Sequence, residues 1–180
     1  RCGAYNRSGC SSFMRDECPA LGIISDANVL IDYLETDREI LSLLSRYLAP
    51  LYVPDIVAEE VSQLKKIDPT SIGITLVETP YSVLAESKDR SSSISMQDFV
   101  CLRIAEERGW VCATNDKALR RECGRRAVSV LWGLEMMLYL VQEGALKPEK
   151  AKDTAWAIHQ CNKTITKKVV DTFIDQIDEL

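Results

Sequence analysis

The stretch Gly22-Ile-Ile-Ser-Asp-Ala-Asn-Val-Leu-Ile31 passes from one apolar run, through a single carboxylate, into a second apolar run. The first run predicts a short buried strand over residues 23–25, and the second predicts a helix over residues 29–34. Asp26 therefore stands at the junction of a strand and a helix. A carboxylate at this position either caps the helix or forms part of a metal site, if other carboxylates follow later strands in the same way.

The alternation of strands and helices continues along the chain and predicts an α/β fold. Further strands are expected over residues 51–53, 73–78, 110–113 and 127–131, and further helices over residues 37–47, 55–66, 81–88, 95–108, 116–123, 132–144, 148–161 and 166–177. Val57, Val61 and Leu64 recur at helical spacing and indicate one continuous helix over residues 55–66. Gly109 and Gly124 are expected to end the helices that precede them. We expect three α/β/α layers, with a central, mostly parallel sheet of about five strands and extra C-terminal helices.

The chain divides by composition into a short head and one domain. Residues 1–20 are polar and without periodicity, which is typical of a disordered head, and residues 88–95 predict a Ser-rich connector. Because the chain begins with Arg and Met14 is a plausible native start, residues 1–13 are expected to be upstream or vector-derived sequence. Residues 21–146 form the expected domain, and residues 147–180 form a helical extension of it.

Bulk composition excludes several classes of protein. The 180 residues are 46% hydrophobic, which is enough for a core, and the longest candidate apolar run, residues 134–141, is too short to span a membrane. The N-terminus lacks the apolar region of a signal peptide. A net charge of −5 argues against a passive nucleic-acid binder but allows an enzyme that holds phosphates through a metal and a local basic patch.

The cysteines indicate free thiols in a reducing cytoplasm. Seven is an odd number, and the sequence has no close C-x-x-C pair. Cys2, Cys10 and Cys18 recur every eight residues, but a zinc knuckle needs closer pairs and usually a His. Neither Cys101 nor Cys112 has a neighbouring residue that would mark a reactive thiolate, so thiol catalysis is not expected.

Carboxylates recur at the expected carboxyl ends of the strands, where α/β sheets form their sites. They are Asp26, the Glu59–Glu60 pair, Asp98 and Asp116. Each also has a purely structural interpretation. Asp26 would be a helix N-cap, and one of the two glutamates would be a solvated side chain. Asp98 would form a capping box with Ser95, and Asp116 would place a favourable charge at a helix N-terminus. Gathered together they would repel one another, and Mg²⁺ or Mn²⁺ would relieve that repulsion.

Four segments resemble, in order and spacing, the acidic motifs of PIN-domain nucleases. They are Ile23-Ile-Ser-Asp-Ala-Asn-Val-Leu-Ile31, Val53-Pro-Asp-Ile-Val-Ala-Glu-Glu-Val61, Ser95-Met-Gln-Asp-Phe-Val-Cys-Leu-Arg-Ile-Ala-Glu106 and Ala113-Thr-Asn-Asp-Lys-Ala-Leu-Arg120. The resemblance covers residues 22–146 and implies a divalent-metal-dependent endoribonuclease. Many prokaryotic members are VapC-type toxins of toxin–antitoxin pairs, so it also implies a homodimer and a cognate antitoxin. The helical tail over residues 131–177 resembles a VapC-related subgroup.

The resemblance implies a role for each motif residue. The metal-binding, catalytic carboxylates are Asp26, Glu60, Asp98 and Asp116, and Glu60 is preferred to Glu59 because an apolar residue follows it. Asn28 would orient Asp26, while Thr114 and Asn115 would position Asp116 or a phosphate. The implied mechanism is in-line attack by a metal-activated water on an RNA phosphodiester, without a covalent nucleophile. His159 is the one histidine of the chain, which excludes a His-pair ribonuclease, and we interpret it as a structural helix residue.

A basic segment follows the last acidic motif. It contains Lys117, Arg120, Arg121, Arg125 and Arg126. The segment is either a solvated helix face or a track for the RNA backbone, with Lys117, Arg120 and Arg121 as candidate RNA contacts. The same face could receive acidic residues of an antitoxin.

Two other functions are consistent with the sequence. A catalytically silent PIN-like module would bind RNA or act as a scaffold, although the presence of all four acids disfavours it. A phospho-acceptor domain phosphorylated on Asp26 would need a second acid two residues later, where the chain has Asn28, or a distant Lys after a strand.

Overall fold

The computed structural model describes residues 22–90 and 93–180, and the predicted head, with Cys2, Cys10 and Cys18, lies outside this part. Five strands form one sheet in the order β3-β2-β1-β4-β5, and every neighbouring pair is parallel. The strands are β1 (Ile23–Ser25), β2 (Leu51–Pro54), β3 (Ile74–Val77), β4 (Val111–Ala113) and β5 (Val130–Leu131). The predicted α/β fold with a central parallel sheet of about five strands is confirmed.

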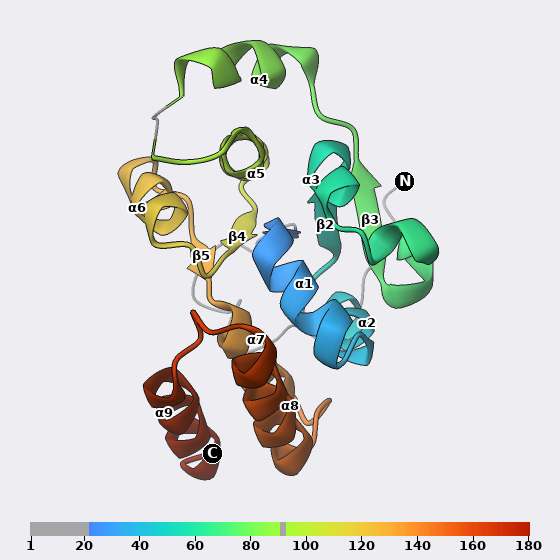
Figure 1. The fold of residues 1–180 in the computed structure, drawn as a ribbon, viewed down its shortest axis with the longest axis vertical. Helices are drawn as coiled ribbons and strands as arrows, with labels where there is room; N and C mark the ends of the chain where they lie inside the picture. The colour runs from blue at the N-terminus through green and yellow to red at the C-terminus, as the bar shows by residue number, and fades with distance from the viewer. Residues whose placement is uncertain (1–21, 91–92) are drawn as a thin grey trace, which may run out of the picture.

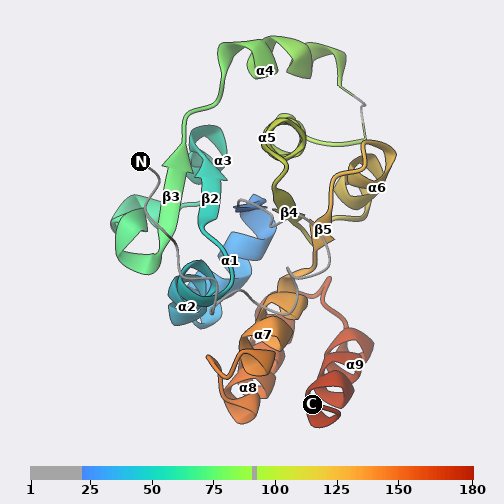
Figure 2. The same ribbon diagram turned by 180° about the vertical axis from the view of Figure 1, so that it is seen from behind.

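Helices flank this sheet and extend beyond it at two opposite ends (Figures 1 and 2). They are α1 (Ala27–Thr36), α2 (Glu39–Tyr47), α3 (Asp55–Glu60), α4 (Tyr81–Glu86), α5 (Met96–Arg108), α6 (Lys117–Arg125), α7 (Gly133–Gln142), α8 (Pro148–Cys161) and α9 (Lys167–Asp178), with short 3₁₀ helices over Leu64–Lys66, Pro69–Ile72 and Ser87–Asp89. Helix α4 lies at one end of the molecule, and α7, α8 and α9 gather at the other.

Strand β1 is the centre of the sheet, and its three residues are all buried. It pairs with β2 on one side and with β4 on the other, which explains why its sequence is almost wholly apolar. The ladder continues one residue beyond the strand, because the Asp26 N–H donates to the Ala113 carbonyl at 3.1 Å. Asp26 is thereby fixed at the middle of the carboxyl edge of the sheet.

Several predicted helix boundaries were wrong, and α1 runs over Ala27–Thr36 where residues 29–34 were predicted. Helix α3 ends at Glu60, because Val61 leaves the helical region at φ −86°, ψ 94° and its N–H donates to the Ala58 carbonyl. Val57, Val61 and Leu64 are all buried nevertheless, since a helix followed by a 3₁₀ turn buries the same apolar stripe as one long helix. The predicted end of α5 at Gly109 is confirmed, with this residue left-handed at φ 65°.

Helix α6 does not end at Gly124, as was predicted, but runs on to Arg125. The left-handed residue is Ala127, at φ 54°, and the Val128 N–H donates to the Cys123 carbonyl at 3.0 Å. This bond spans the end of the helix in the manner of a Schellman motif. The turn therefore falls three residues later than the glycine indicated.

The C-terminal helices share the hydrophobic core of the sheet. Ile158 of α8 and Phe173 of α9 are buried in the same cluster as Ile24 of β1. The Asn162 amide, directly after α8, donates to the Asp32 carboxylate of α1 at 2.8 Å. Among residues 22–90 and 93–180, no helix has the length and apolar character needed to cross a membrane.

Candidate metal centre

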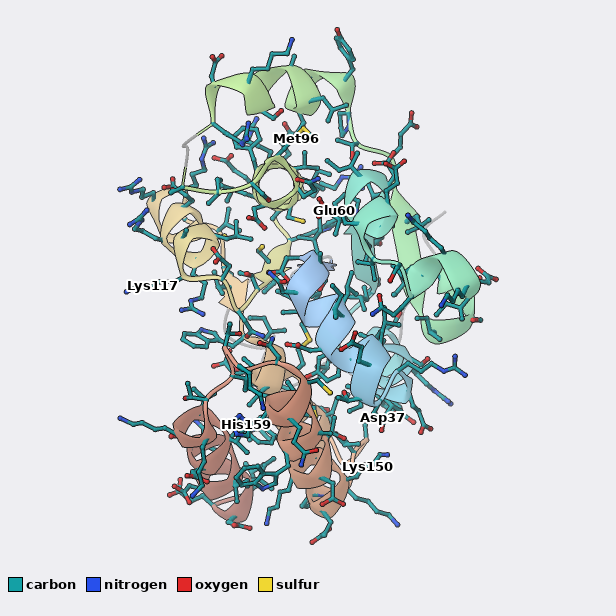
Figure 3. All side chains as sticks on the ribbon, viewed as in Figure 1. Asp37, Glu60, Met96, Lys117, Lys150 and His159 are labelled. Atoms are coloured by element: carbon teal, nitrogen blue, oxygen red, sulfur yellow. The ribbon has the colours of Figure 1, made fainter. Side chains whose placement is uncertain are left out.

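Three of the four predicted acids line one pocket of about 200 Å³ at the carboxyl edge of the sheet. Asp26 comes from the end of β1, Glu60 from the end of α3, and Asp98 from the first turn of α5. Figure 3 labels Glu60 on α3, and the hydrogen bond from the Gln97 amide to Glu60 joins α3 to the start of α5. The fold thus gathers carboxylates from three separate elements around one small cavity.

Asp26 supplies the most buried of these carboxylates, with 1% of its surface exposed. Its Oδ1 accepts the Val29 N–H at 2.8 Å and so caps α1, as the structural interpretation predicted. Its Oδ2 is buried and accepts no hydrogen bond from any described residue. Capping therefore uses one oxygen and leaves the other without a partner, which is costly for a buried carboxylate unless a ligand completes it.

Burial raises the pKa of Asp26 from 3.8 to about 6. The Thr114 hydroxyl and the Val29 N–H oppose this rise, while the charges of Asp98 and Asp32 add to it. The Thr114 hydroxyl favours the charged form by its proximity, although it does not meet the geometry of a full hydrogen bond to Oδ2. A divalent cation beside Asp26 would lower this pKa, because it would stabilise the ionised form of the carboxyl group.

Asp98 takes part in the predicted capping box at the start of α5. The Ser95 N–H donates to Asp98 Oδ2 at 3.1 Å, and the Asp98 N–H donates to Ser95 Oγ at 3.0 Å. No described residue donates to Asp98 Oδ1. The box fixes the carboxylate at the rim of the pocket and leaves one oxygen available.

Glu60 closes the pocket from the opposite side. It is exposed, and its Oε1 accepts a hydrogen bond from the Gln97 amide of α5. Glu59 is also exposed and does not line the pocket. Of the two adjacent glutamates, Glu60 is therefore the one that the fold brings to Asp26 and Asp98.

Asp116 lies apart from this pocket, at the end of the neighbouring strand β4. Its Oδ1 accepts the Leu119 N–H at 2.7 Å and caps α6, and its own N–H donates to Thr114 Oγ1 at 2.9 Å. It is not among the residues that line the pocket. The structure thus brings three predicted acids together and places the fourth one strand away.

Asn28 and Asn115, which were also predicted to support the site, lie in different surroundings. Asn28 lines the pocket from the first turn of α1. The Asn115 side chain instead accepts the Gly133 N–H at 2.9 Å and donates to Asp32 at 3.4 Å. Asn115 therefore connects the loop after β4 with α1 and α7, and its side chain is not hydrogen-bonded to Asp116.

Asp32 is a buried carboxylate that sequence reasoning missed. It accepts hydrogen bonds from the amides of Asn162 and Asn115, and burial raises its pKa to about 6. Beside it, the buried Tyr33 hydroxyl donates to the Gly133 carbonyl. The sequence signal was an acid directly between the apolar Ile31 and Tyr33, a position at which a buried charge needs hydrogen-bond partners.

Within residues 22–90 and 93–180, no three Asp, Glu, Cys or His side chains converge closely enough to hold one ion as they stand. Glu60 and Asp98 each have one oxygen engaged by Gln97 and Ser95. The donors are nevertheless hard oxygens of the kind that Mg²⁺ and Mn²⁺ prefer, and Mg²⁺ usually keeps several waters and takes only one or two carboxylates. The donor set, led by the unpartnered Asp26 Oδ2, therefore fits such an ion.

The basic segment separates into paired and unpaired cations. Arg125 pairs with Glu122 of the same helix at 2.7 Å, and Arg126 pairs with Glu106 at 3.0 Å. The three predicted RNA contacts, Lys117, Arg120 and Arg121, make no ion pair within the part of the chain that the structure describes. Figure 3 places Lys117 on α6 and Glu60 on α3, with α5 between them in this view.

Cys101, beside the pocket, and His159, in the C-terminal helices, both make contacts of a structural kind. Cys101 lines the pocket but is fully buried, and its S–H donates to the Ser25 carbonyl at 3.6 Å, while burial raises the pKa of its thiol. His159 Nδ1 contacts the Ile165 carbonyl at 2.6 Å. In Figure 3 His159 lies among the C-terminal helices, away from Glu60.

Comparison with models of known protein families finds no match for this chain. Comparison with curated protein sequences finds none either. The resemblance to PIN-domain nucleases is therefore carried by the four motifs alone.

Proposed function

We propose that this chain is a divalent-metal-dependent endoribonuclease of the PIN type. One observation supports the proposal above the others: a buried carboxylate oxygen, Asp26 Oδ2, has no partner in a pocket that Glu60 and Asp98 also line. Caps alone would explain carboxylates at the starts of α1 and α5, but they do not explain an oxygen that is buried and unsatisfied. A cation that binds a phosphodiester would satisfy it.

The position of each acid indicates the role that it would have in the proposed reaction. Asp26 would bind Mg²⁺ or Mn²⁺ through Oδ2, since Oδ1 is held by the Val29 N–H. Asp98 and Glu60 would complete the site from α5 and α3, and Asp116 would face the substrate or its water from the end of β4. When bound, the ion lowers the pKa of a water and neutralises the charge of the scissile phosphate.

The experiment is cleavage of single-stranded RNA by purified protein in Mg²⁺ or Mn²⁺. Asp26→Asn and Asp98→Asn should fold normally and lose cleavage by about 100-fold or more, as removal of groups that stabilise the transition state does. Glu59→Gln is the matched control, because it changes an adjacent exposed acid outside the pocket and should cleave as the wild type does. Full activity of the wild type in EDTA would refute the proposal.

A second candidate is a catalytically silent module that binds RNA or acts as a scaffold. It is favoured by the finding that, within residues 22–90 and 93–180, no three Asp, Glu, Cys or His side chains converge closely enough to hold one ion. Calorimetric titration with Mn²⁺ separates the two functions. Binding by the wild type that is lost in Asp26→Asn supports the nuclease, whereas no heat at millimolar metal supports the silent module.

The finer assignment is also a proposal: a cytoplasmic, homodimeric toxin with a cognate antitoxin. If it is correct, expression of the wild type arrests growth of a bacterial host, while Asp98→Asn does not. Co-expression of the product of a neighbouring gene would restore growth, and light scattering would give the mass of a dimer. Growth that is equal for both proteins would refute the toxin role without refuting RNA cleavage.

A further inference from the structure

A second, larger hollow lies between the start of α7 and helix α9. Its volume is about 530 Å³, and apolar side chains of Leu134, Ile165 and Phe173 form part of its lining. Arg120, Trp132 and Lys168 also line it. This groove is distinct from the acidic pocket, because none of these residues lines both.

The groove contains a preformed stack of a cation on an aromatic ring. The Arg120 guanidinium carbon lies 3.7 Å from the centre of the Trp132 ring, within the range of a cation–π contact. The same guanidinium donates to the Asn115 carbonyl at 2.8 Å, which fixes its orientation. Trp132 is still 44% exposed, so a large part of the indole is open to a ligand.

The charges in the groove favour an anionic ligand. Two cations, Arg120 and Lys168, line it against one carboxylate, Glu135, whose Oε2 accepts the backbone N–H of Trp132 at 2.9 Å. The Lys168 ammonium is exposed and makes no ion pair within the described part of the chain. In a chain with a net charge of −5, this concentration of cations around an exposed indole is a local exception.

The groove opens on the same edge of the sheet as the acidic pocket. Trp132 directly follows β5, Asn115 follows the adjacent β4, and Asp26 follows β1, which is the next strand along. Neighbouring strands lie about 4.8 Å apart, so two steps separate the Asp26 strand from the Trp132 strand by roughly 10 Å. A single-stranded nucleic acid with a phosphate at Asp26 can reach Trp132 within a few nucleotides.

We propose that this groove binds one unpaired base of the RNA substrate, stacked on Trp132 beside Arg120, with Lys168 facing the adjoining phosphate. Stacking on an aromatic ring together with a backbone cation is the usual chemistry of single-strand binding. The inference rests on RNA being the ligand in the proposed function. It does not use the metal, so binding can be measured separately from cleavage.

The test measures the affinity of a short, fluorescein-labelled single-stranded RNA by anisotropy, with EDTA present to prevent cleavage. Trp132→Ala should weaken binding about 5- to 100-fold, the range expected for loss of one stacked base. Trp132→Phe should restore most of the affinity, because it keeps an aromatic face. Tyr81→Ala is the matched control: it removes another exposed aromatic side chain, on α4 at the other end of the molecule, and should bind as the wild type does.

Lys168→Ala provides a second measurement, in which affinity should fall for all RNA sequences and the slope of log affinity against log salt should decrease by about one. Equal RNA affinity of Trp132→Ala and the wild type would overturn the inference and leave the groove to a protein partner. Wild-type protein that does not bind RNA in EDTA would also overturn it. Failure of the proposed nuclease gives a different result: RNA binds and Trp132→Ala weakens it, but no cleavage follows when Mn²⁺ is added.

Discussion

Replacement of Asp26 by Asn should stabilise the metal-free protein at alkaline pH, although it removes the proposed activity. The Asp26 side chain is buried, its Oδ2 has no partner, and burial raises its pKa from 3.8 to about 6. Asn carries no charge and keeps an oxygen that can accept the Val29 N–H. Its amide nitrogen would take the place of the oxygen that has no partner, and the neighbouring Thr114 hydroxyl has a lone pair available to accept a hydrogen bond.

The pH dependence of this effect follows from the direction of the pKa change. Because the folded protein holds the proton more tightly than the unfolded chain, the contribution of Asp26 to stability is fully present below about pH 4. It is lost as the pH rises through about 6. The interval from 3.8 to about 6 corresponds to about 3 kcal/mol, and incomplete hydrogen bonding of the buried amide lowers the expected gain to about 1–3 kcal/mol.

The assay is urea unfolding followed by circular dichroism, in EDTA, at pH 8 and at pH 4. Asp26→Asn should unfold at higher urea than the wild type at pH 8, and the difference should shrink or vanish at pH 4. Asp32, whose pKa is also raised to about 6, is present in both proteins, so its contribution to the pH dependence of stability largely cancels in the comparison. Glu59→Gln is the control and should show no such change. Equal stability of wild type and Asp26→Asn at pH 8, or a gain of the same size at pH 4, would refute the reasoning.

Two further predictions concern the contacts that join α1, α7 and α8. Gly133→Ala should lower the free energy of unfolding by about 1–2 kcal/mol, since an added Cβ would lie 2.7 Å from the hydrogen-bonded Asn115 amide. At Gly124 an added Cβ would meet nothing within 4 Å, so Gly124→Ala should raise the free energy of unfolding by about 0.5–1 kcal/mol, measured by urea unfolding. Equal effects of the two substitutions would contradict the prediction. Asn162→Ala removes one of the two amides on the buried Asp32 carboxylate and should cost about 1–3 kcal/mol, read as a lower thermal midpoint. An unchanged midpoint would show that this contact does not hold the helices.

The fold was predictable where the signals are local. The apolar run before Asp26, the Ser95 and Asp98 pair, and Gly109 each act within a few residues, through burial, capping or a left-handed turn. Periodicity was less informative around Val61, because the same stripe of buried residues suits a helix and a helix followed by a 3₁₀ turn. The sequence does not predict the positive φ of Ala127, since this conformation is set by the turn rather than by the residue.

The site was predictable only in part, because much of it depends on contacts between distant residues. Asp26, Glu60 and Asp98 follow strands or start helices, so the topology of a parallel sheet places them at one edge. Asp32 and Asn162 are 130 positions apart, and nothing in either local sequence indicates their hydrogen bond. The stack of Arg120 on Trp132 likewise appears only when β4 and β5 lie side by side.

The hydrogen bond between Asp32 and Asn162 has a consequence for the order of events during translation. Asn162 lies 130 positions after Asp32, so the Asp32 carboxylate must wait for this amide donor while the intervening residues are translated. The final docking of α8 against α1 is therefore a late step. All five strands precede Asn162 in the chain, so the sheet can form before this contact between α1 and α8 is completed.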